Sequence, residues 1–269
     1  MEHPNHIEPI REYLLHLYND THRYVACRAE NSQDFLKWQD DARPVLQHML
    51  GLESIGATMG DHVIRVELGP LEDLGDYTRR HAYISTEPHF RLPFWYLLPK
   101  GEGPFPLALL PHGHDNHGKD TYVGIAHDDT HKQKIETEDR DVAIQAVKRG
   151  FAAISPGVRG QGDVGIPDIN KRHSARDCRS QFMHAILAGR TATGERVWDM
   201  MRLIDWAQDM PEIDTTNILL MGNSGGGVIT LFTAAADTRV TIAVPSCSYC
   251  TFIGKSGLLH HCDCNAEIG

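Results

Sequence analysis

The sequence predicts an α/β fold, in which a mostly parallel sheet carries helices on both faces behind a helical N-terminal extension. Short runs that are mostly apolar, without polar residues at every second position, indicate strands covered on both sides. These runs occupy residues 107–110, 151–155, 218–221 and 240–244. Stretches with helical spacing alternate with the runs, and this alternation is typical of a parallel sheet. The fold class follows from these two patterns together.

The N-terminal extension is predicted over residues 1–58. Apolar residues recur there at helical spacing, and Gly51 ends the pattern. They are Ile10, Tyr13, Leu14, Leu17, Phe35, Trp38, Val45, Leu46 and Met49. From residue 59 to residue 269 we expect one α/β domain. In the first part of this domain apolar residues recur at every second position, which predicts three antiparallel strands at 62–68, 80–84 and 94–98.

Three helices are predicted between the apolar strands. Their apolar residues recur at intervals of three or four, and Gly150 and Pro211 follow the first two. The predicted helices span residues 139–148, 193–210 and 228–236. Each lies between two predicted strands or follows one, which supports crossover connections in a parallel sheet.

The charge balance excludes some classes of function. The chain has 269 residues and a formal net charge of −10, which argues against nucleic acid or an anionic membrane as a partner. No apolar run approaches the roughly 18 residues of a membrane-spanning helix. The N-terminus lacks the basic and apolar regions of a secretory signal, so we expect a cytoplasmic protein. Its six cysteines are then not expected to form disulfides.

The strongest motif for chemistry is Gly222-Asn223-Ser224-Gly225-Gly226, between an apolar strand and a predicted helix. A serine at such a turn has its hydroxyl exposed, and the flanking glycines allow close approach of the backbone. The helix N-terminus and the Gly225 amide would face an oxyanion on the substrate. We therefore predict Ser224 as a nucleophile and the Gly225 N–H as one oxyanion donor.

A second oxyanion donor is expected from the loop after the strand at 107–110. That loop reads Pro111-His112-Gly113-His114, and the backbone amide of His114 is the best candidate. The two imidazoles are expected to shape the loop, because a base that precedes the serine contradicts the usual order of nucleophile, acid and histidine. The motif predicts that Ser224 and Gly113 lie at one edge of the sheet.

Several further motifs occur in a characteristic order. They are His112–His114, Ser155–Gly162, Gly194–Asp199, Pro211–Asp214 and Gly222–Gly226. From about Phe35 onward, the chain thereby resembles the α/β-hydrolase superfamily, and within it the acetyl xylan esterase and dienelactone hydrolase branch. The resemblance implies a serine esterase that cleaves short acyl esters, such as acetylated carbohydrates, through an acyl-enzyme and without a cofactor. A serine peptidase of the prolyl-peptidase type is the alternative. Arg159-Gly160 is interpreted as a structural turn.

The resemblance also implies an acid and a histidine after the nucleophile, yet 45 residues follow Ser224. Asp237 precedes the strand at 240–244 and should lie at the opposite edge of the sheet. His260 or His261 could be the base. We expect instead that the chain is truncated, with both partners beyond Gly269 and with little activity of its own. The strand at 240–244 would then be an exposed edge that favours a homo-oligomer.

A different class of function comes from the C-terminal cysteines. Thiolates and imidazoles at short spacing are ligands that zinc favours. The residues concerned are Cys247, Cys250, His260, His261, Cys262 and Cys264. Their spacing differs from that of a zinc finger, so we predict no metal site and regard a zinc-bound nucleic-acid module as the weaker alternative. A hydrolase fold without catalytic activity is a third.

Overall fold

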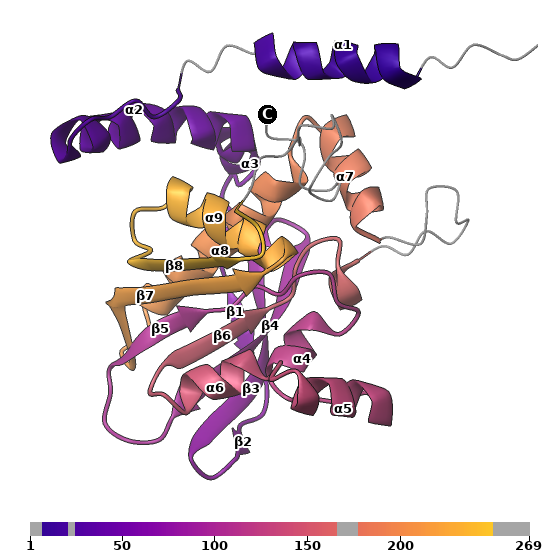
Figure 1. Cartoon of the computed structure of the whole chain (residues 1–269). Coiled ribbons are helices and arrows are strands. Elements are labelled where there is room, and N and C mark those ends of the chain that lie inside the picture. The colour runs from indigo at the N-terminus through magenta and orange to yellow at the C-terminus, as the bar shows by residue number, and fades with distance from the viewer. Residues whose placement is uncertain (1–6, 21–24, 166–176, 250–269) are drawn as a thin grey trace, which may run out of the picture.

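The protein is represented by a computed structural model, which describes residues 7–20, 25–165 and 177–249 (Figure 1). The strands of these residues form one eight-stranded sheet in the order β1-β3-β4-β6-β5-β7-β8, with β2 paired to β3. The strands are β1 (Val66–Leu68), β2 (Glu72–Asp73), β3 (Tyr77–Glu87), β4 (Phe90–Pro99), β5 (Phe105–Leu109), β6 (Ala152–Pro156), β7 (Ile213–Asn223) and β8 (Ile242–Ser246).

The sheet has an antiparallel half and a parallel half. β1 to β4 form the predicted antiparallel part, and β4 also pairs antiparallel with β6. From β6 through β5 and β7 to β8 all pairings are parallel. The C-terminal ends of the parallel strands therefore meet at one edge of the sheet, where residues from distant parts of the chain come together.

Helices cover both faces of the sheet, as predicted (Figure 1). α8 (Ala192–Gln208) and α9 (Gly225–Ala236) lie on one face, where Met200, Leu203 and Ile229 join the apolar side chains of the strands. α4 (Gly118–Tyr122) and α6 (Val142–Val147) lie on the other face. Burial of two apolar layers, one on each face, is the main source of stability in such a domain.

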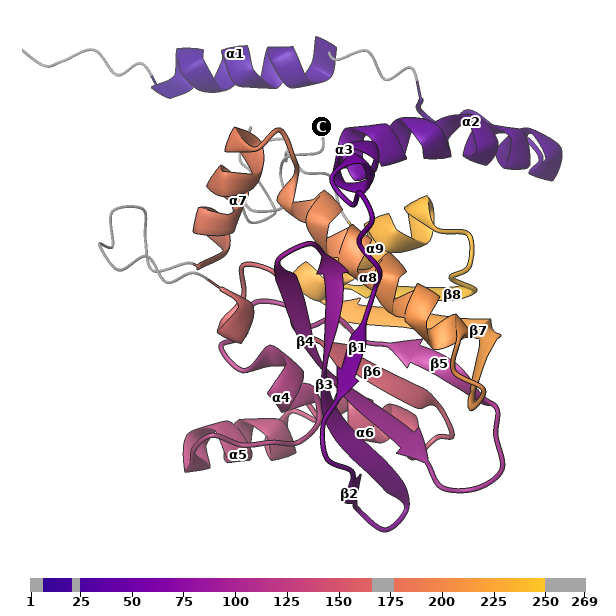
Figure 2. The same ribbon diagram turned by 180° about the vertical axis from the view of Figure 1, so that it is seen from behind.

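The N-terminal extension is helical, with α1 (Ile7–Asp20), α2 (Ser32–Leu50) and α3 (Leu52–Ala57). Gly51 separates α2 from α3 in a left-handed conformation with φ of 75°, which fits its predicted role as a helix end. α2 and α3 pack on α8 and α9 through a small apolar cluster that includes Leu50 and Trp198. α1 stands apart from the sheet in both ribbon views (Figures 1 and 2).

The structure also contains helices that the sequence patterns did not predict. They are α4, α5 (Asp129–Thr137) and α7 (Asp177–Leu187). α5 is polar, with His131 and Ile135 as its buried residues, so it lacks the apolar stripe on which the prediction depended. The helix predicted over 139–148 is shorter, and the helix predicted from 228 begins at Gly225. In the second case three helical glycines were mistaken for part of the turn.

None of the helices in the described residues is long and apolar enough to cross a membrane.

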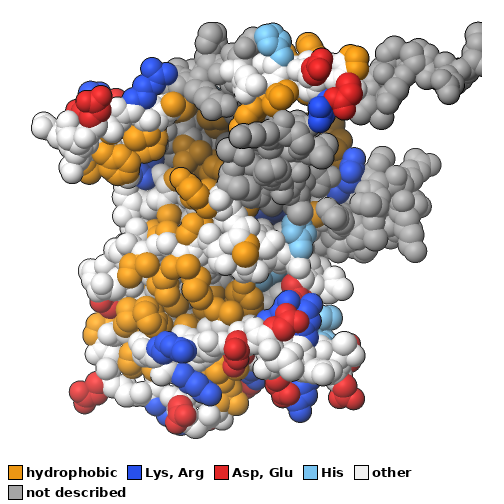
Figure 3. Space-filling model, in the orientation of Figure 1, with side chains coloured by type: hydrophobic (Ala, Val, Ile, Leu, Met, Phe, Trp, Pro, Cys, Tyr) orange, Lys and Arg blue, Asp and Glu red, His pale blue; other side chains and the backbone are white. Residues whose placement is uncertain are grey.

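Within the described residues, β8 pairs with β7 alone. Ile242 and Val244 on β8 are 58% and 41% exposed, and hydrophobic side chains gather on the face that carries β7 and β8 (Figure 3). An exposed apolar strand of this kind favours association, so the homo-oligomer stays a prediction.

Candidate functional site

Ser224 lies between the end of β7 and the start of α9, as predicted from the sequence. Its backbone is strained, with a positive φ of 56° and a ψ of −119° that lies outside the left-handed helical region. A non-glycine residue with this conformation is uncommon and often marks a functional turn. The Ser224 N–H donates to the Ser246 carbonyl oxygen at 2.9 Å, which ties the turn to β8. The Ser224 side chain is exposed and available to a substrate.

The glycines around Ser224 are required by close backbone contacts. A Cβ atom on Gly226 would lie 2.1 Å from the Pro111 carbonyl oxygen. A Cβ on Gly222 would lie 2.4 Å from the Gly226 carbonyl oxygen. Both distances are far shorter than any real contact, and the colliding atoms belong to the backbone. The turn after β7 and the loop after β5 therefore fit together only without side chains.

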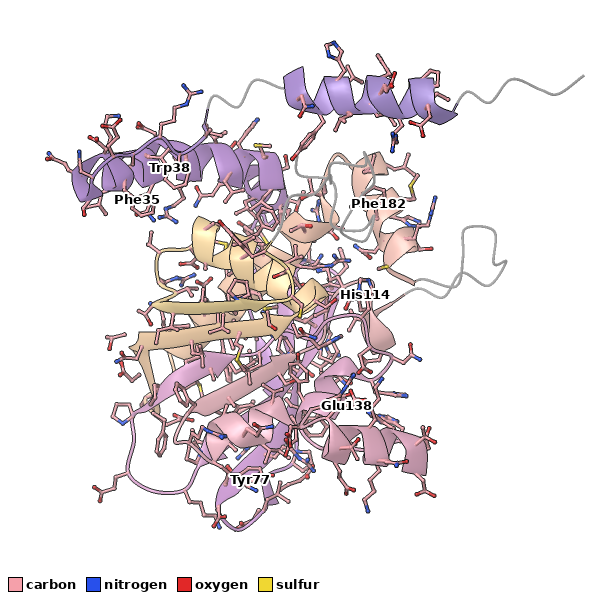
Figure 4. All side chains as sticks on the ribbon, in the orientation of Figure 1. Phe35, Trp38, Tyr77, His114, Glu138 and Phe182 are labelled. Carbon is pink, nitrogen blue, oxygen red and sulfur yellow. The ribbon has the colours of Figure 1, made fainter. Side chains whose placement is uncertain are left out.

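The loop after β5 lies directly against the turn. A Cβ on Gly113 would be 3.1 Å from the Ser224 Cβ and 3.3 Å from the Gly225 nitrogen. This confirms that Ser224 and Gly113 share one edge of the sheet. The His114 ring (Figure 4) lies with Nε2 3.2 Å from the Cys178 Sγ of α7. The His112 Nδ1 lies 2.7 Å from the Gly113 carbonyl oxygen. These contacts fit the loop-shaping role predicted for both imidazoles.

A pocket of about 340 Å³ opens beside the turn. It is lined by His112, Gly113, His114, Asp115, Thr121, Tyr122, Glu138, Asp139, Arg140, Val142, Asn223 and Ser224. Arg140 is engaged by carboxylates, since its guanidinium lies 2.5 Å from Glu138 and 3.6 Å from Asp115. Burial raises the pKa of Tyr122, which keeps its phenol neutral. The pocket can therefore hold a small polar group but offers no unpaired cation from its described lining.

A buried ion cluster fixes the loop after β6, and the sequence patterns did not predict it. The Arg159 guanidinium donates to both oxygens of Asp199 at 2.7 Å and to Glu87 at 2.6 Å. Thr86 donates to Asp199 at 2.6 Å, and Arg159 also lies 3.9 Å from the Phe90 ring centre. The signal was the Arg159-Gly160 motif, whose interpretation as a structural turn fits these contacts.

Three histidines form a cluster beside the pocket. The rings of His117 and His127 are stacked at 3.9 Å, and His131 lies 4.9 Å from His117. His127 Nε2 is 2.9 Å from Asp120, and His131 Nε2 is 3.0 Å from the Thr121 hydroxyl. Stacked rings do not direct their nitrogens toward one ion. Over the residues that the structure describes, no group of three or more metal-ligating side chains is arranged to hold a metal.

Comparison with known proteins gives partial similarities to esterases. The acetyl xylan esterase family model matches residues 131–254. The chain is 20% identical to a Bacteroides fragilis NCTC 9343 protein provisionally described as an acetyl xylan esterase, with a TM-score of 0.65 over 89% of this chain and 59% of that one. The methylesterase BT1017 gives a TM-score of 0.56 and 19% identity over 89% of this chain and 46% of that one.

The chain has the α/β-hydrolase fold. It also matches the Bacillus subtilis (strain 168) protein YtaP, which carries a provisional description as a hydrolase. The two are 24% identical over 190 residues, which make up 69% of this chain and 58% of YtaP. The chain thus spans 58% of YtaP, 59% of the Bacteroides fragilis protein and 46% of BT1017.

Of the residues considered from the sequence as partners of Ser224, the structure describes Asp237 but not His260 or His261. Asp237 ends α9 and pairs with Arg239 at 2.6 Å. Ser224 begins the same 12-residue helix, which separates the two by about 18 Å. Asp237 is therefore not a partner of Ser224, as expected. His260 and His261 lie outside the described residues, so their role stays a prediction.

The possible zinc ligands are only partly covered by the structure. Cys247 is exposed directly after β8 and has a φ of 55°. Cys250, Cys262 and Cys264 lie outside the described residues.

The stability of this protein is expected to fall as the pH falls below about 6.5. Burial lowers the pKa of His112 below its ordinary value of 6.5, so the unfolded chain takes up a proton that the folded chain excludes. The contribution of His112 to the free energy of unfolding is complete above pH 6.5 and is lost as the pH falls toward the folded-state pKa. It amounts to about 1.4 kcal/mol for each unit between the unfolded-state and folded-state pKa values. Urea unfolding at pH 7.5 and 5.5 measures it. His112→Gln should flatten the profile.

Proposed function

We propose that this protein is a serine carboxylesterase that cleaves short acyl esters, of which acetylated carbohydrates are the first candidates. The observation that carries the proposal is the strained, exposed Ser224 at the mouth of a pocket, with the Gly113 loop against it. The partial match to acetyl xylan esterases supports an ester of a carbohydrate. A pocket of about 340 Å³ suits a small acyl group.

In the proposed reaction, the Ser224 Oγ attacks the ester carbonyl carbon and gives a tetrahedral intermediate. The negative charge on the former carbonyl oxygen is stabilised by the N–H groups of Gly225 and His114. Collapse of the intermediate expels the alcohol and leaves an acyl group on Ser224, which water then removes. A histidine base is required to accept the Ser224 proton, and no residue is assigned to this role.

Ser224→Ala is expected to abolish ester cleavage and covalent labelling. Only the hydroxyl is removed from an exposed side chain, so the fold should be retained. The measurement is labelling by a fluorophosphonate, followed by mass spectrometry of the peptide that contains residue 224, and hydrolysis of nitrophenyl acetate. Ser246→Ala is the matched control, because Ser246 is an exposed serine on the neighbouring strand.

Three outcomes would count against the proposal in different ways. Equal labelling of Ser224→Ala and the unchanged protein would exclude Ser224 as the nucleophile. Preferential cleavage of a nitroanilide amide over the ester would favour a peptidase. Absence of any labelling at Ser224 would contradict its role as an activated nucleophile, whereas low turnover alone is the result expected for a chain with little activity of its own.

A further inference from the structure

Gln161 is a buried polar residue beside the candidate nucleophile. Its side chain is 3% exposed, and within the described part of the chain neither its Oε1 nor its Nε2 has a hydrogen-bond partner. Leaving a buried amide unpaired costs free energy, and such groups are rare in folded proteins. An apolar residue of the same size would avoid this cost. The polarity of Gln161 therefore calls for an explanation outside stability.

The loop after β6 holds Gln161 in a fixed place. The Gln161 N–H donates to the Val158 carbonyl oxygen at 2.9 Å, and its own carbonyl oxygen accepts from the Val164 N–H at 3.1 Å. Arg159, two residues before it, belongs to the buried ion cluster. Gly160 has φ of 78° and packs so closely on Gln181 of α7 that a Cβ would lie 2.6 Å away. Contacts on both sides thus restrict the position of this turn.

The side chain of Gln161 extends from this loop to the turn that carries Ser224. Its Nε2 lies 3.2 Å from the place where a Cβ of Gly225 would be, and the His114 Nδ1 lies 3.6 Å from the same place. Gly225 and His114 are the two residues whose amides are proposed as oxyanion donors. The Gln161 carboxamide therefore occupies the space that the missing side chain of Gly225 leaves open.

We propose that the Gln161 carboxamide strengthens the oxyanion site electrostatically, by adding its N–H dipole to the amides of Gly225 and His114. The inference rests on the proposed function of Ser224. A dipole held in a buried position acts strongly on a charge that develops nearby during the reaction, and it costs no reorganisation at that moment. An N–H group without a protein acceptor is suited to this role, since no other acceptor competes for it.

The test uses phenylboronic acid, whose boron accepts the Ser224 oxygen and becomes a tetrahedral anion. Gln161→Leu keeps the size of the side chain and removes the carboxamide dipole. We expect the dissociation constant of this variant for phenylboronic acid to rise at least tenfold. Gln161→Glu should weaken binding further at pH 8, where the carboxylate repels the anion. Toward pH 5 its binding, relative to the unchanged protein at the same pH, should recover as the carboxyl takes up a proton. This pH-dependent recovery would not arise from a purely steric role.

Gly225→Ala tests the same inference without substituting Gln161. Its methyl group would meet the Gln161 Nε2 at 3.2 Å and must displace the carboxamide, so boronate binding should weaken here too. Thermal unfolding of each variant establishes that the fold is retained.

The possible outcomes separate this inference from the proposed function. In one outcome, boronate binding depends on Ser224, but the dissociation constants of Gln161→Leu and Gln161→Glu stay within twofold of that of the unchanged protein. This result overturns the role of Gln161 alone. Equal binding by Ser224→Ala and the unchanged protein, or no binding at all, contradicts the proposed function, and the role of Gln161 is then wrong as well.

Discussion

Arg159→Met is expected to lower the free energy of unfolding by about 3–5 kcal/mol, the range for breaking a buried ion pair by removing one partner. The change leaves the buried carboxylates of Asp199 and Glu87 without the guanidinium that they share. Methionine retains most of the apolar stem of Arg159, while the guanidinium that lies over the Phe90 ring is removed. The loss therefore measures uncompensated charge more than lost packing. Chemical denaturation at pH 7 provides the value.

Arg91→Met is the matched control, because Arg91 also lies over an aromatic ring and also pairs with a carboxylate. It lies 4.7 Å from the Tyr83 ring centre and pairs with Glu67. Both partners are more than half exposed in their side chains, so its loss should cost less than about 1 kcal/mol. Equal destabilisation by the two substitutions would contradict the role assigned to the buried cluster.

The effect of Arg159→Met should also depend on pH. Burial raises the pKa of Asp199, and the charge and hydrogen bonds of Arg159 work against this rise. Removing Arg159 should raise that pKa further. A carboxyl whose pKa is raised in the folded state contributes fully to stability at pH values below its ordinary pKa of 3.8. This contribution to stability is lost as the pH rises. The destabilisation should therefore be smaller near pH 4 than at pH 7.

Gly226→Ala is the second large effect, and it should act on stability and on Ser224 together. The new methyl group would lie 2.1 Å from the Pro111 carbonyl oxygen and 2.9 Å from the His112 carbonyl carbon. Since both are backbone atoms, the two loops must move apart. Overpacking of this kind costs about 1–3 kcal/mol, and we expect the upper end of that range. Labelling of Ser224 by a fluorophosphonate should be lost even where the fold persists.

Gly56→Ala is the control for this substitution. Gly56 lies in α3, and a Cβ there would meet the Trp198 ring at 3.7 Å, an ordinary contact. Alanine favours a helix over glycine by about 1 kcal/mol, so the change should be neutral or stabilising. Unaltered labelling and stability in Gly226→Ala would show that the two loops tolerate separation, which would contradict the close fit described for this site.

Local patterns in the sequence determined the elements and the position of the nucleophile. Apolar runs without alternation predicted the parallel strands, because burial on both faces leaves no polar face. The glycines around Ser224 predicted a strand-to-helix turn, because only glycine permits such close backbone contacts. Polar helices such as α5 could not be predicted in the same way, since few of their residues are buried and their sequence has no apolar stripe.

Only the tertiary structure decided which polar residues meet. Thr86, Arg159 and Asp199 come from segments separated by up to 113 residues, and no local spacing connects them. Gln161 had a place in a recognised motif, but its contact with Gly225 depends on β6 and β7 lying on either side of β5. Periodicity reports the environment of one element at a time, whereas charge pairing and close contact are properties of the packed sheet edge. The sequence alone therefore located Ser224, and the fold assembled the surroundings that give Ser224 its proposed chemistry.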